Sequence, residues 1–514
     1  MSSLPQSSKA QFHGQLESAL NEKFKPAEAQ AIARFSELLF THLPPEELDE
    51  RRFSDSYGAL LGAWHFMQQG PGEEPKLRVF NPDLGSDGWQ STHTVLYVLH
   101  RDMPFLIDSI RIAINQRGIG IHTLYYSVVA TERDDQGNLK SLAEASRTKR
   151  DEAMIVLEVD RHSDNSELKA LEQVIQDVLH EVRMAVADFS AMKQKATEIR
   201  DQLGAPRGNV SEECRKEAGD LINWLIDDHF TFLGYDEYDF VRNGKSVSVE
   251  RVEGSELGIL RVNNERPAKV RLSVLPKRTR AEMTQTDQLF IFAKSAQRSR
   301  VHRPAYPDYI AVKKFNDDGE VIGERRFLGL YTARAYDERP DEIPLLRQKV
   351  EEVRKQSNFL PNDYAGKELD QILTLYPRDE LFQIGAEELA QIATDILYIQ
   401  ERRQIRLFLR EDVYGQFVTC LAFFPRDIYT TELRLKVESV LRDYLQAEDI
   451  EFVTHFSESV LARVQFTVRV PRVENRQLPA DEIERRVVDL AQSWQDGLAE
   501  ALNEHYGEEA ASNL

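Results

Sequence analysis

Residues 94–129 read TVLYVLHRDMPFLIDSIRIAINQRGIGIHTLYYSVV, and this stretch decides the fold. Its first seven residues are mostly β-branched, aliphatic or aromatic, which predicts a strand covered on both faces. An amphipathic helix is predicted next, from apolar residues spaced three and four apart: Leu106, Ile107, Ile110 and Ile114. We expect Asp102 to cap this helix, Pro104 to lie in its first turn and Gly118 to follow its end in a left-handed conformation. With the apolar run that follows, the stretch predicts a strand–helix–strand unit.

The elements around this unit predict the order strand, strand, helix, strand, strand, helix. The added elements are strands over 77–80 and 153–160, a hairpin turn at 135–138, and a long helix over 166–203. The same order recurs near the C-terminus, with strands over 404–410, 417–424, 451–458 and 462–470 and helices over 431–445 and 481–504. An Arg-Asp pair marks each strand-to-helix junction, at Arg101-Asp102 and at Arg426-Asp427. We infer an internal duplication of a ferredoxin-like ββαββα sandwich.

The rest of the chain completes an α+β protein of five predicted parts. Residues 1–72 are predicted to be helical, with a break at Pro44 and Pro45. Residues 73–205 and 404–514 hold the two sandwiches, the second with a C-terminal helix. Between them, residues 206–339 predict a sensor-like antiparallel sheet, and residues 340–403 a helical connector broken at Pro361 and Pro377.

Charge and composition limit the function classes. A net charge of -21 argues against an overall role in binding nucleic acid or an anionic membrane, because the protein's field would repel phosphates. Cys214 and Cys420 have no C-x-x-C companion, which favours a reducing, cytoplasmic setting over disulfides or zinc. The sequence shows neither a secretory signal pattern nor an apolar run of the roughly 20 residues that a membrane helix needs.

No catalytic constellation is visible in the sequence. Gly118-x-Gly120 lacks a third glycine and follows a helix instead of preceding one, so it does not predict a dinucleotide loop. A Walker loop, a G-x-S-x-G elbow and H-E-x-x-H are also missing. His100, His122 and His229 have no metal-ligand spacing and are interpreted as packed or edge histidines. We therefore expect a regulatory or structural role, with no metal and no cofactor bound by this segment.

Two regions are candidate effector sites. At the junction Asp102-Met103-Pro104, with Asp108 in the helix that follows, a strand-to-helix turn presents N–H groups to a carboxylate; the alternative is that Asp102 only caps the helix. The second is a basic cluster, joined upstream by Lys277, Arg278 and Arg280, whose members are Arg298, Arg300, His302 and Arg303. It suits an anionic effector or an acidic partner surface, and the alternative is a solvated loop.

Several segments identify the chain as resembling a known family. Arg378-Asp379-Glu380 predicts a helix start, which explains the two acids at the positive end of the dipole better than it explains the arginine. Its surroundings, YPRDELFQ at 376–383, together with HRDMPFLIDSIR, RSRVHRPAYPDYIAVKKF, RRFLGLYTARAY and FFPRDIYTT, resemble the N-terminal region of the large NAD-specific glutamate dehydrogenases. The resemblance extends from about residue 33 to the end of the chain.

The resemblance implies an architecture and a parent activity. In that family this region carries two ACT-like modules flanking a PAS-like domain, and the catalytic domain, which uses NAD to oxidise L-glutamate to 2-oxoglutarate and ammonium, lies beyond it. The chain is thus expected to be a non-catalytic segment whose partners are its own catalytic region and sibling subunits, with an amino-acid effector as a further ligand. Phe105 stands where many amino-acid-binding ACT domains have glycine after Asp-x-Pro. Because a phenylalanine fills that space, subunit contact is favoured over effector binding at this junction.

Overall fold

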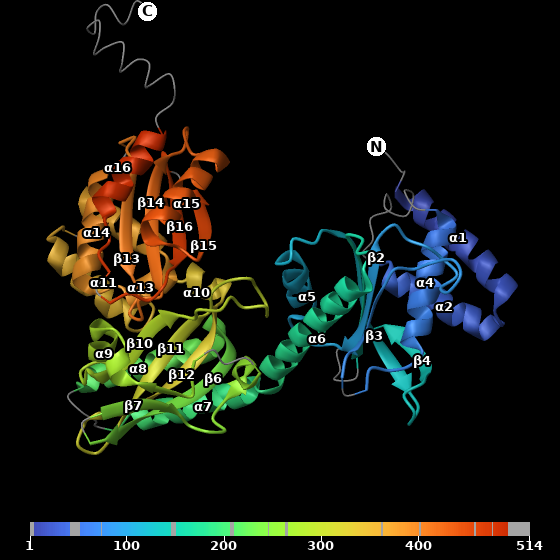
Figure 1. The fold of residues 1–514 in the computed structure, drawn as a ribbon, viewed down its shortest axis with the longest axis horizontal. Helices are drawn as coiled ribbons and strands as arrows, with labels where there is room; N and C mark the ends of the chain where they lie inside the picture. The colour runs from blue at the N-terminus through green and yellow to red at the C-terminus, as the bar shows by residue number, and fades with distance from the viewer. Residues whose placement is uncertain are drawn as a thin grey trace, which may run out of the picture. The chain divides into compact units, whose positions relative to one another are not determined.

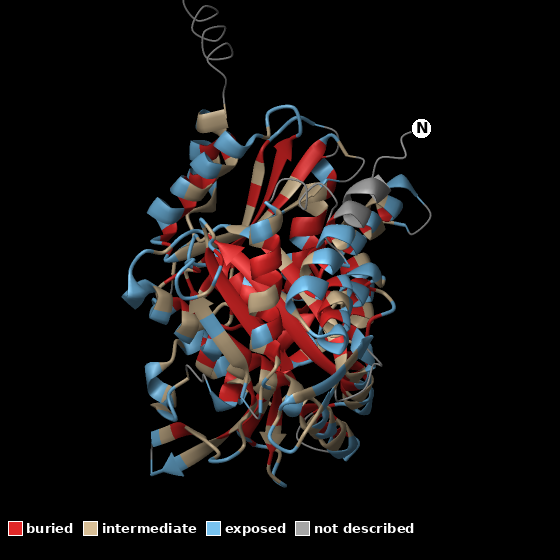
Figure 2. Cartoon of the chain, turned by 90° about the vertical axis from the view of Figure 1, so that its right-hand side faces the viewer, coloured by how far each residue is buried: buried red, intermediate tan, exposed pale blue. Residues whose placement is uncertain are grey.

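The computed structural model describes residues 5–41, 52–72, 74–144, 151–205, 210–244, 246–262, 266–360, 363–399, 402–456, 459–474 and 476–491. The break predicted at Pro44 and Pro45 lies outside these residues, as does the predicted C-terminal helix beyond residue 491. The chain forms two compact units, which are residues 1–187 with 299–304, and residues 188–298 with 305–514. The strand residues 94–100, 151–159 and 417–425 are buried without interruption, and Figure 2 shows the burial of each element.

The first unit is built on a five-stranded antiparallel sheet (Figure 1). Its elements are β1 Lys76–Phe80, β2 Thr94–Arg101, α5 Leu106–Asn115, β3 Ile121–Arg133, β4 Leu139–Glu144, β5 Asp151–Val159 and α6 Asn165–Ala187. The strand order is β1-β2-β5-β3-β4, so β5 lies between the two strands that α5 connects. The predicted strand–helix–strand unit is therefore split by an inserted strand, and the predicted turn at 135–138 joins β3 to an additional edge strand, β4.

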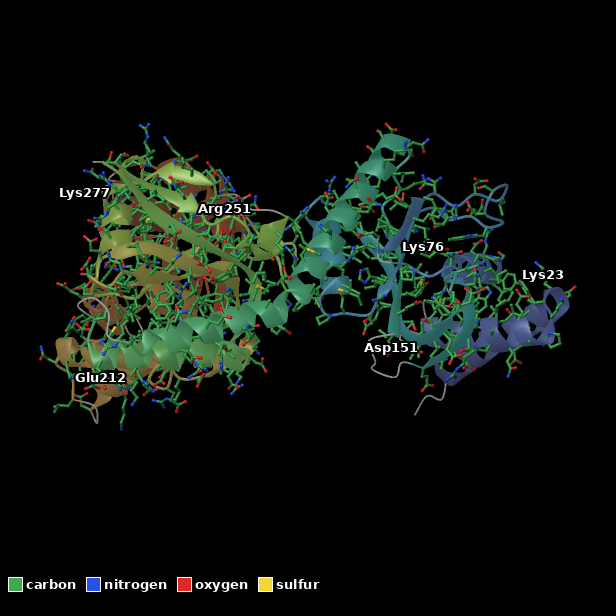
Figure 3. The ribbon with its side chains drawn as sticks, turned by 90° about the horizontal axis from the view of Figure 1, so that it is seen from below. Lys23, Lys76, Asp151, Glu212, Arg251 and Lys277 are labelled. Atoms are coloured by element: carbon green, nitrogen blue, oxygen red, sulfur yellow. The ribbon has the colours of Figure 1, made fainter. Side chains whose placement is uncertain are left out.

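Helices cover both faces of this sheet. On one face α5 packs with α6, as the apolar spacing of the sequence predicted. On the other face three N-terminal helices, α1 Pro5–Lys23, α2 Pro26–Leu39 and α4 Phe53–Met67, share a core with the inward side chains of the strands, among them Tyr97, Leu99 and Met154. Lys76, labelled in Figure 3, donates from Nζ to the carbonyl oxygen of Phe66 at 2.6 Å, which ties β1 to the end of α4.

The helix predicted over 166–203 is two helices, α6 and α7 Phe189–Leu203, and that prediction was wrong at Asp188. Asp188 has φ -90° and ψ 0°. Its carboxylate accepts a hydrogen bond from the backbone N–H of Gly258 at 2.8 Å and pairs with Arg261 at 3.2 Å. These partners lie some 70 residues later in the chain, so the local helical pattern carried no sign of the break.

The second unit contains a seven-stranded antiparallel sheet. Its main path runs β10-β11-β12-β6-β7-β9, with β8 paired to β6. The strands are β6 Phe230–Asn243, β7 Ser246–Arg251, β8 Leu257–Gly258, β9 Lys269–Arg271, β10 Phe290–Lys294, β11 Asp308–Phe315 and β12 Val321–Tyr331. α8 Glu212–Trp224 precedes β6 and packs against α7, and α9 Lys277–Thr284, whose first residue is labelled in Figure 3, precedes β10. The predicted strand at 308–315 is confirmed residue for residue.

A helical connector leads from this sheet to a smaller one. The connector consists of α10 Ala333–Asp337, α11 Leu346–Ser357, α12 Tyr364–Leu375, α13 Arg378–Gln383 and α14 Ala386–Ile399. The four-stranded sheet that follows has the order β13-β14-β16-β15, built from β13 Arg406–Glu411, β14 Phe417–Pro425, α15 Thr431–Leu445, β15 Asp449–Phe456, β16 Leu461–Arg469 and α16 Ala480–Ala491. Taken in chain order, this is the order of β1-β2-β5-β3, which agrees with the inferred duplication.

Candidate functional site

The junction after β2 differs from its prediction. α5 begins at Leu106 with Phe105 at the N-cap position, and no side chain caps it, so Asp102 is not the cap and Pro104 is outside the helix. Instead, the carboxylate of Asp102 accepts a hydrogen bond from the hydroxyl of Tyr126 at 3.1 Å. Phe105 has φ 74°, in the left-handed region that favours glycine. Gly118 does follow the helix with φ 70°, as predicted.

Residues 299–304 belong to the first unit and pack against this junction. The ring of His302 lies 4.8 Å from the ring of Phe105, and its backbone N–H donates to the hydroxyl of buried Ser109 at 3.2 Å. Burial, with the nearby charge of Arg303, lowers the pKa of His302 against the opposing effect of Asp108. The two predicted effector regions therefore meet in part, because His302 covers the start of α5 beside Phe105.

The basic cluster is divided between the two units. In the first unit, both Nε and Nη2 of Arg300 bind the carboxylate of Glu181, a buried residue of α6. In the second unit, Arg298 pairs with Asp449 at 2.9 Å and with Glu451 at 3.1 Å, and its guanidinium stacks over the ring of Tyr306. Arg298 and Arg300 thus hold the fold through acids of the chain itself. Met103, Asp108 and Arg303 remain candidate effector residues by prediction only.

The segment Arg378-Asp379-Glu380 forms the centre of a buried polar network, which we call the α13 hub. Glu380 accepts hydrogen bonds from Arg410 of β13 at 2.7 and 3.0 Å and from the hydroxyl of Thr419 of β14 at 2.7 Å. Asp379 pairs with Lys294 of β10 at 2.9 Å, and Lys294 pairs in turn with Asp308 of β11 at 3.1 Å. One short helix therefore joins the seven-stranded sheet to the four-stranded sheet.

Arg378 completes the hub through backbone oxygens. Its guanidinium donates to the carbonyl groups of Ala335, Tyr336 and Glu338 at 3.0, 3.2 and 2.8 Å, which are acceptors at and after the end of α10. Burial opposes ionisation of Asp379, but the ammonium of Lys294 outweighs it and holds the pKa of Asp379 below its ordinary value. The acids of this motif are buried ion-pair partners, a role beyond the helix start that the sequence predicted.

The Arg-Asp pair of the second module lies at the surface, unlike the buried residues of the α13 hub. Arg426 and Asp427 are exposed; the guanidinium of Arg426 lies 5.3 Å from the ring centre of Phe456, and Asp427 pairs with Arg403 at 3.0 Å. The helix cap after this pair is Thr430, whose hydroxyl accepts from the backbone N–H of Leu433 at 3.1 Å.

A cavity of about 480 Å³ borders the hub. Its apolar wall includes Phe292 and Phe382, whose rings stack at 5.0 Å, and Arg410 lines it as well. Lys349 of α11 also lines the cavity, and its Nζ donates to three carbonyl oxygens at and after the end of α13, at 2.6, 3.2 and 2.7 Å. Burial, with the nearby charge of Arg410, lowers the pKa of Lys349 to about 7. A small molecule bound here would touch the residues that fix α13.

Sequence reasoning missed a second buried charge cluster, in the seven-stranded sheet. The guanidinium of Arg326 binds the carboxylate of Asp236 at 2.5 Å, with both side chains almost fully buried, and it lies 4.4 and 4.8 Å from the ring centres of Tyr238 and Tyr309. Glu324 pairs with Arg266 at 2.8 Å. The available signal was the presence of two charged runs, Asp236-Glu237 and Glu324-Arg325-Arg326, in the middle of two strands that carry many apolar and aromatic residues.

Metal chemistry finds no support in the part of the chain that the structure describes, where no group of three or more His, Cys, Asp or Glu side chains could hold an ion. His229 stacks on Trp224 at 4.5 Å and pairs with Glu338 at 3.0 Å, which is a packed setting. His122 pairs with Asp160 at 2.7 Å and stacks on His93 at 4.1 Å, at the end of the first sheet.

The comparisons with known proteins agree with this architecture. Residues 35–175 match the ACT1 domain of glutamate dehydrogenase, residues 343–402 its helical motif 1, and residues 406–495 its ACT2 domain. The chain is 43% identical over 511 residues to an NAD-specific glutamate dehydrogenase of Halomonas elongata and 42% identical over 510 residues to one of Pseudomonas aeruginosa. These matches cover 97% and 99% of this chain. The chain belongs to the NAD-specific glutamate dehydrogenase family.

A more distant relative supports the family assignment, and the lengths of the relatives show how much of them this chain covers. The chain is 30% identical over 373 residues to the NAD-specific glutamate dehydrogenase of Mycobacterium tuberculosis, over 72% of this chain. It spans about 31% of the length of the Halomonas and Pseudomonas proteins. The α13 hub lies within the glutamate dehydrogenase helical motif 1 and reaches into the ACT2 domain, while Lys294 comes from the sheet between the ACT1 and helical motif matches.

Proposed function

We propose that this chain is the regulatory and oligomer-assembly region of an NAD-dependent glutamate dehydrogenase. In the intact parent protein the reaction would convert L-glutamate, NAD and water into 2-oxoglutarate, ammonium and NADH, and the residues that bind NAD and perform the hydride transfer would lie outside this chain. Such a region needs elements that transmit a state between domains, and sites where ligands or subunits bias that state.

The observation that carries this proposal is the α13 hub. Asp379 and Glu380 are adjacent residues, yet each completes a buried ion pair with a different sheet. Because a buried charge without its partner is costly, a shift of α13 relative to either sheet would break one pair, and the two sheets are constrained to respond together. The cavity beside Lys349 offers a place where a small effector would bias that coupling.

The middle sheet is proposed to be a PAS-like domain. Its support is an antiparallel sheet of ordered register between the ACT1 and helical motif matches, together with the family resemblance of the sequence. We propose a cytoplasmic location, with the protein's own catalytic region and sibling subunits as partners and without nucleic-acid or membrane binding. Its net charge of -21 supports this, and among the described residues no helix has the length and apolar character to cross a bilayer.

An independent amino-acid sensor is the second candidate function, and the 480 Å³ cavity favours it. Two measurements on the purified chain separate the candidates. We expect no reduction of NAD in the presence of glutamate, and measurable reduction would contradict the assignment of catalysis to other residues. Calorimetric titration with single amino acids should release heat if the chain is a sensor. No heat with any of them would remove the sensor role and leave assembly.

A further inference from the structure

Strand β15 is the open edge of the four-stranded sheet. Within the part of the chain that the structure describes it pairs only with β16, in an uninterrupted register that runs from Asp449 opposite Arg469 to Phe456 opposite Ala462. Proteins protect such edges with proline, with charged side chains, especially lysine, or with a bulge, because the outward N–H and C=O groups otherwise template another strand. The sequence of β15, DIEFVTHF, contains neither proline nor lysine, its pairing has no bulge, and its two acids, Asp449 and Glu451, are both paired with Arg298.

Apolar side chains are exposed along this edge. Phe452, Val453 and Phe456 of β15 are 43%, 66% and 54% exposed, and Leu435 and Tyr444 of α15 are exposed in the same module. The guanidinium of Arg434 lies 4.1 Å from the ring centre of Phe452, so this ring is held at the edge by a cation–π contact. An apolar patch along an unpaired strand is typical of a protein interface.

Three other sheet edges in the described part of the chain are protected. In the first unit β1 carries Lys76 and Arg78, and β4 carries Lys140 and pairs with β3 through an irregular register. At the opposite edge of the four-stranded sheet, the backbone N–H of Leu407 in β13 donates to the carboxylate of Glu484 at 2.8 Å. The β15 edge therefore differs from its counterparts in the same molecule.

We infer that β15 pairs antiparallel with β15 of a second copy of this chain, about a two-fold axis with Val453 opposite itself. This inference rests on the assembly role proposed above and names its surface. A two-fold axis normal to the sheet leaves each face of the sheet on its own side. Residues that lie opposite each other must therefore differ by an even number in sequence position, and one residue of each strand lies on the axis. Only Phe452, Val453 and Thr454 are central enough to lie there.

Polar pairing selects Val453 from these three. With Val453 on the axis, Glu451 lies opposite His455 of the second copy on both sides, Phe452 lies opposite Thr454, and Ile450 lies opposite Phe456. Moving the axis to Phe452 places the carboxylate of Glu451 opposite Val453, and moving it to Thr454 places His455 opposite Val453. Glu451 pairs with Arg298 at 3.1 Å, and its carboxylate, which has several acceptor sites, can also accept a hydrogen bond from the imidazole N–H of the facing histidine.

Disulfide trapping tests the register in the full chain. In a Cys214→Ser background, because Cys420 is buried, Val453→Cys places two thiols opposite each other on the axis. We expect most of this variant to run as a disulfide-linked dimer on a non-reducing gel after mild oxidation. Val274→Cys, at a valine that is 72% exposed and lies outside this apolar surface, should stay monomeric. A Val453→Cys chain that stays monomeric, or Phe452→Cys that links more readily, overturns the inference.

Sedimentation equilibrium tests the surface without a cross-link. Val453→Lys puts two like charges on the axis, and we expect dimer dissociation to become at least tenfold easier. Val274→Lys, at a valine that is 72% exposed in the same unit, should leave dissociation unchanged. A wild-type chain that is monomeric at every concentration overturns both this surface and self-assembly of the chain. Self-association that neither Val453 variant alters overturns the β15 surface alone and leaves the assembly role standing.

Discussion

Neutralising Glu380 is expected to destabilise the second unit by about 3 kcal/mol. The Glu380 carboxylate accepts two hydrogen bonds from Arg410 and one from Thr419, and both side chains of the ion pair are at most 6% exposed. Removing one partner of a buried pair costs about 3–5 kcal/mol because the other charge is left uncompensated. In Glu380→Gln the amide oxygen keeps one acceptor, which places the expected loss at the lower end of that range.

The assay is urea unfolding followed by the fluorescence of Trp224. Trp224 lies in the second unit with its ring 6.0 Å from that of Phe382, so it reports on packing next to the hub. The other three tryptophans are changed to phenylalanine: Trp64, Trp89 and Trp494. Glu352→Gln, an exposed change on α11, is the matched control and should not move the transition.

A double-mutant cycle decides whether the ion pair is the cause. We expect Glu380→Gln and Arg410→Met together to cost less than the sum of the two single changes by about 2 kcal/mol, since the double variant leaves no unpaired charge. A loss below about 1 kcal/mol for Glu380→Gln alone, or strict additivity, would refute the view that this pair holds the two sheets together.

Three further outcomes follow from the same structure. Because Lys294 lowers the pKa of Asp379, the folded chain binds a proton on this carboxylate more weakly than the unfolded chain does. The stabilisation from ionised Asp379 is present above about pH 4 and is lost as the pH falls through the lowered pKa. Asp379→Asn should therefore flatten the acid side of a plot of urea midpoint against pH. Gly258→Ala should lower the free energy of unfolding in urea by more than about 2 kcal/mol, since Gly258 has φ 63° and an added Cβ would lie 2.1 Å from a carbonyl oxygen. The control Gly254→Ala, with φ 76° and open space around the added Cβ, should lower it by about 1 kcal/mol. Arg300→Ala should lower the thermal midpoint of the first unit, with a loss of about 2 kcal/mol in stability after allowance for the part-exposed guanidinium. Adding Glu181→Gln to the same chain should recover part of that loss. An unchanged midpoint would mean that the pair of Arg300 with Glu181 does not stabilise the unit.

Local periodicity predicted most elements of this chain from sequence. The run at 94–100 and the turn at 135–138 depend on neighbours within a few residues, and both lie where the pattern placed them. The helix between them exists as predicted but begins at Leu106, after Pro104. The order of strands in the second module likewise gave the duplication that the two sheets show. The end of a helix at Asp188 was missed because its cause, Gly258, lies far along the chain.

The roles of charged residues were harder to predict, since they depend on contacts between distant segments. Arg378 binds carbonyl groups about 40 residues upstream, which no helix-dipole argument contains. Arg298 and Arg300 are two residues apart in one basic run, yet they pair with acids of different units. Phe105 was expected to fill space at the junction. Its left-handed backbone and the contact of its ring with His302 could be seen only in the tertiary structure.

The α13 hub limits how this protein can be divided. A cut between the seven-stranded and four-stranded sheets would leave Lys294 without Asp379 on one fragment, or Arg410 without Glu380 on the other, each in an apolar setting. Neither fragment would be expected to fold with its native stability. The two sheets should therefore be inherited as a pair, and chimaeras between relatives should keep α13 with both of its cationic partners from the same parent.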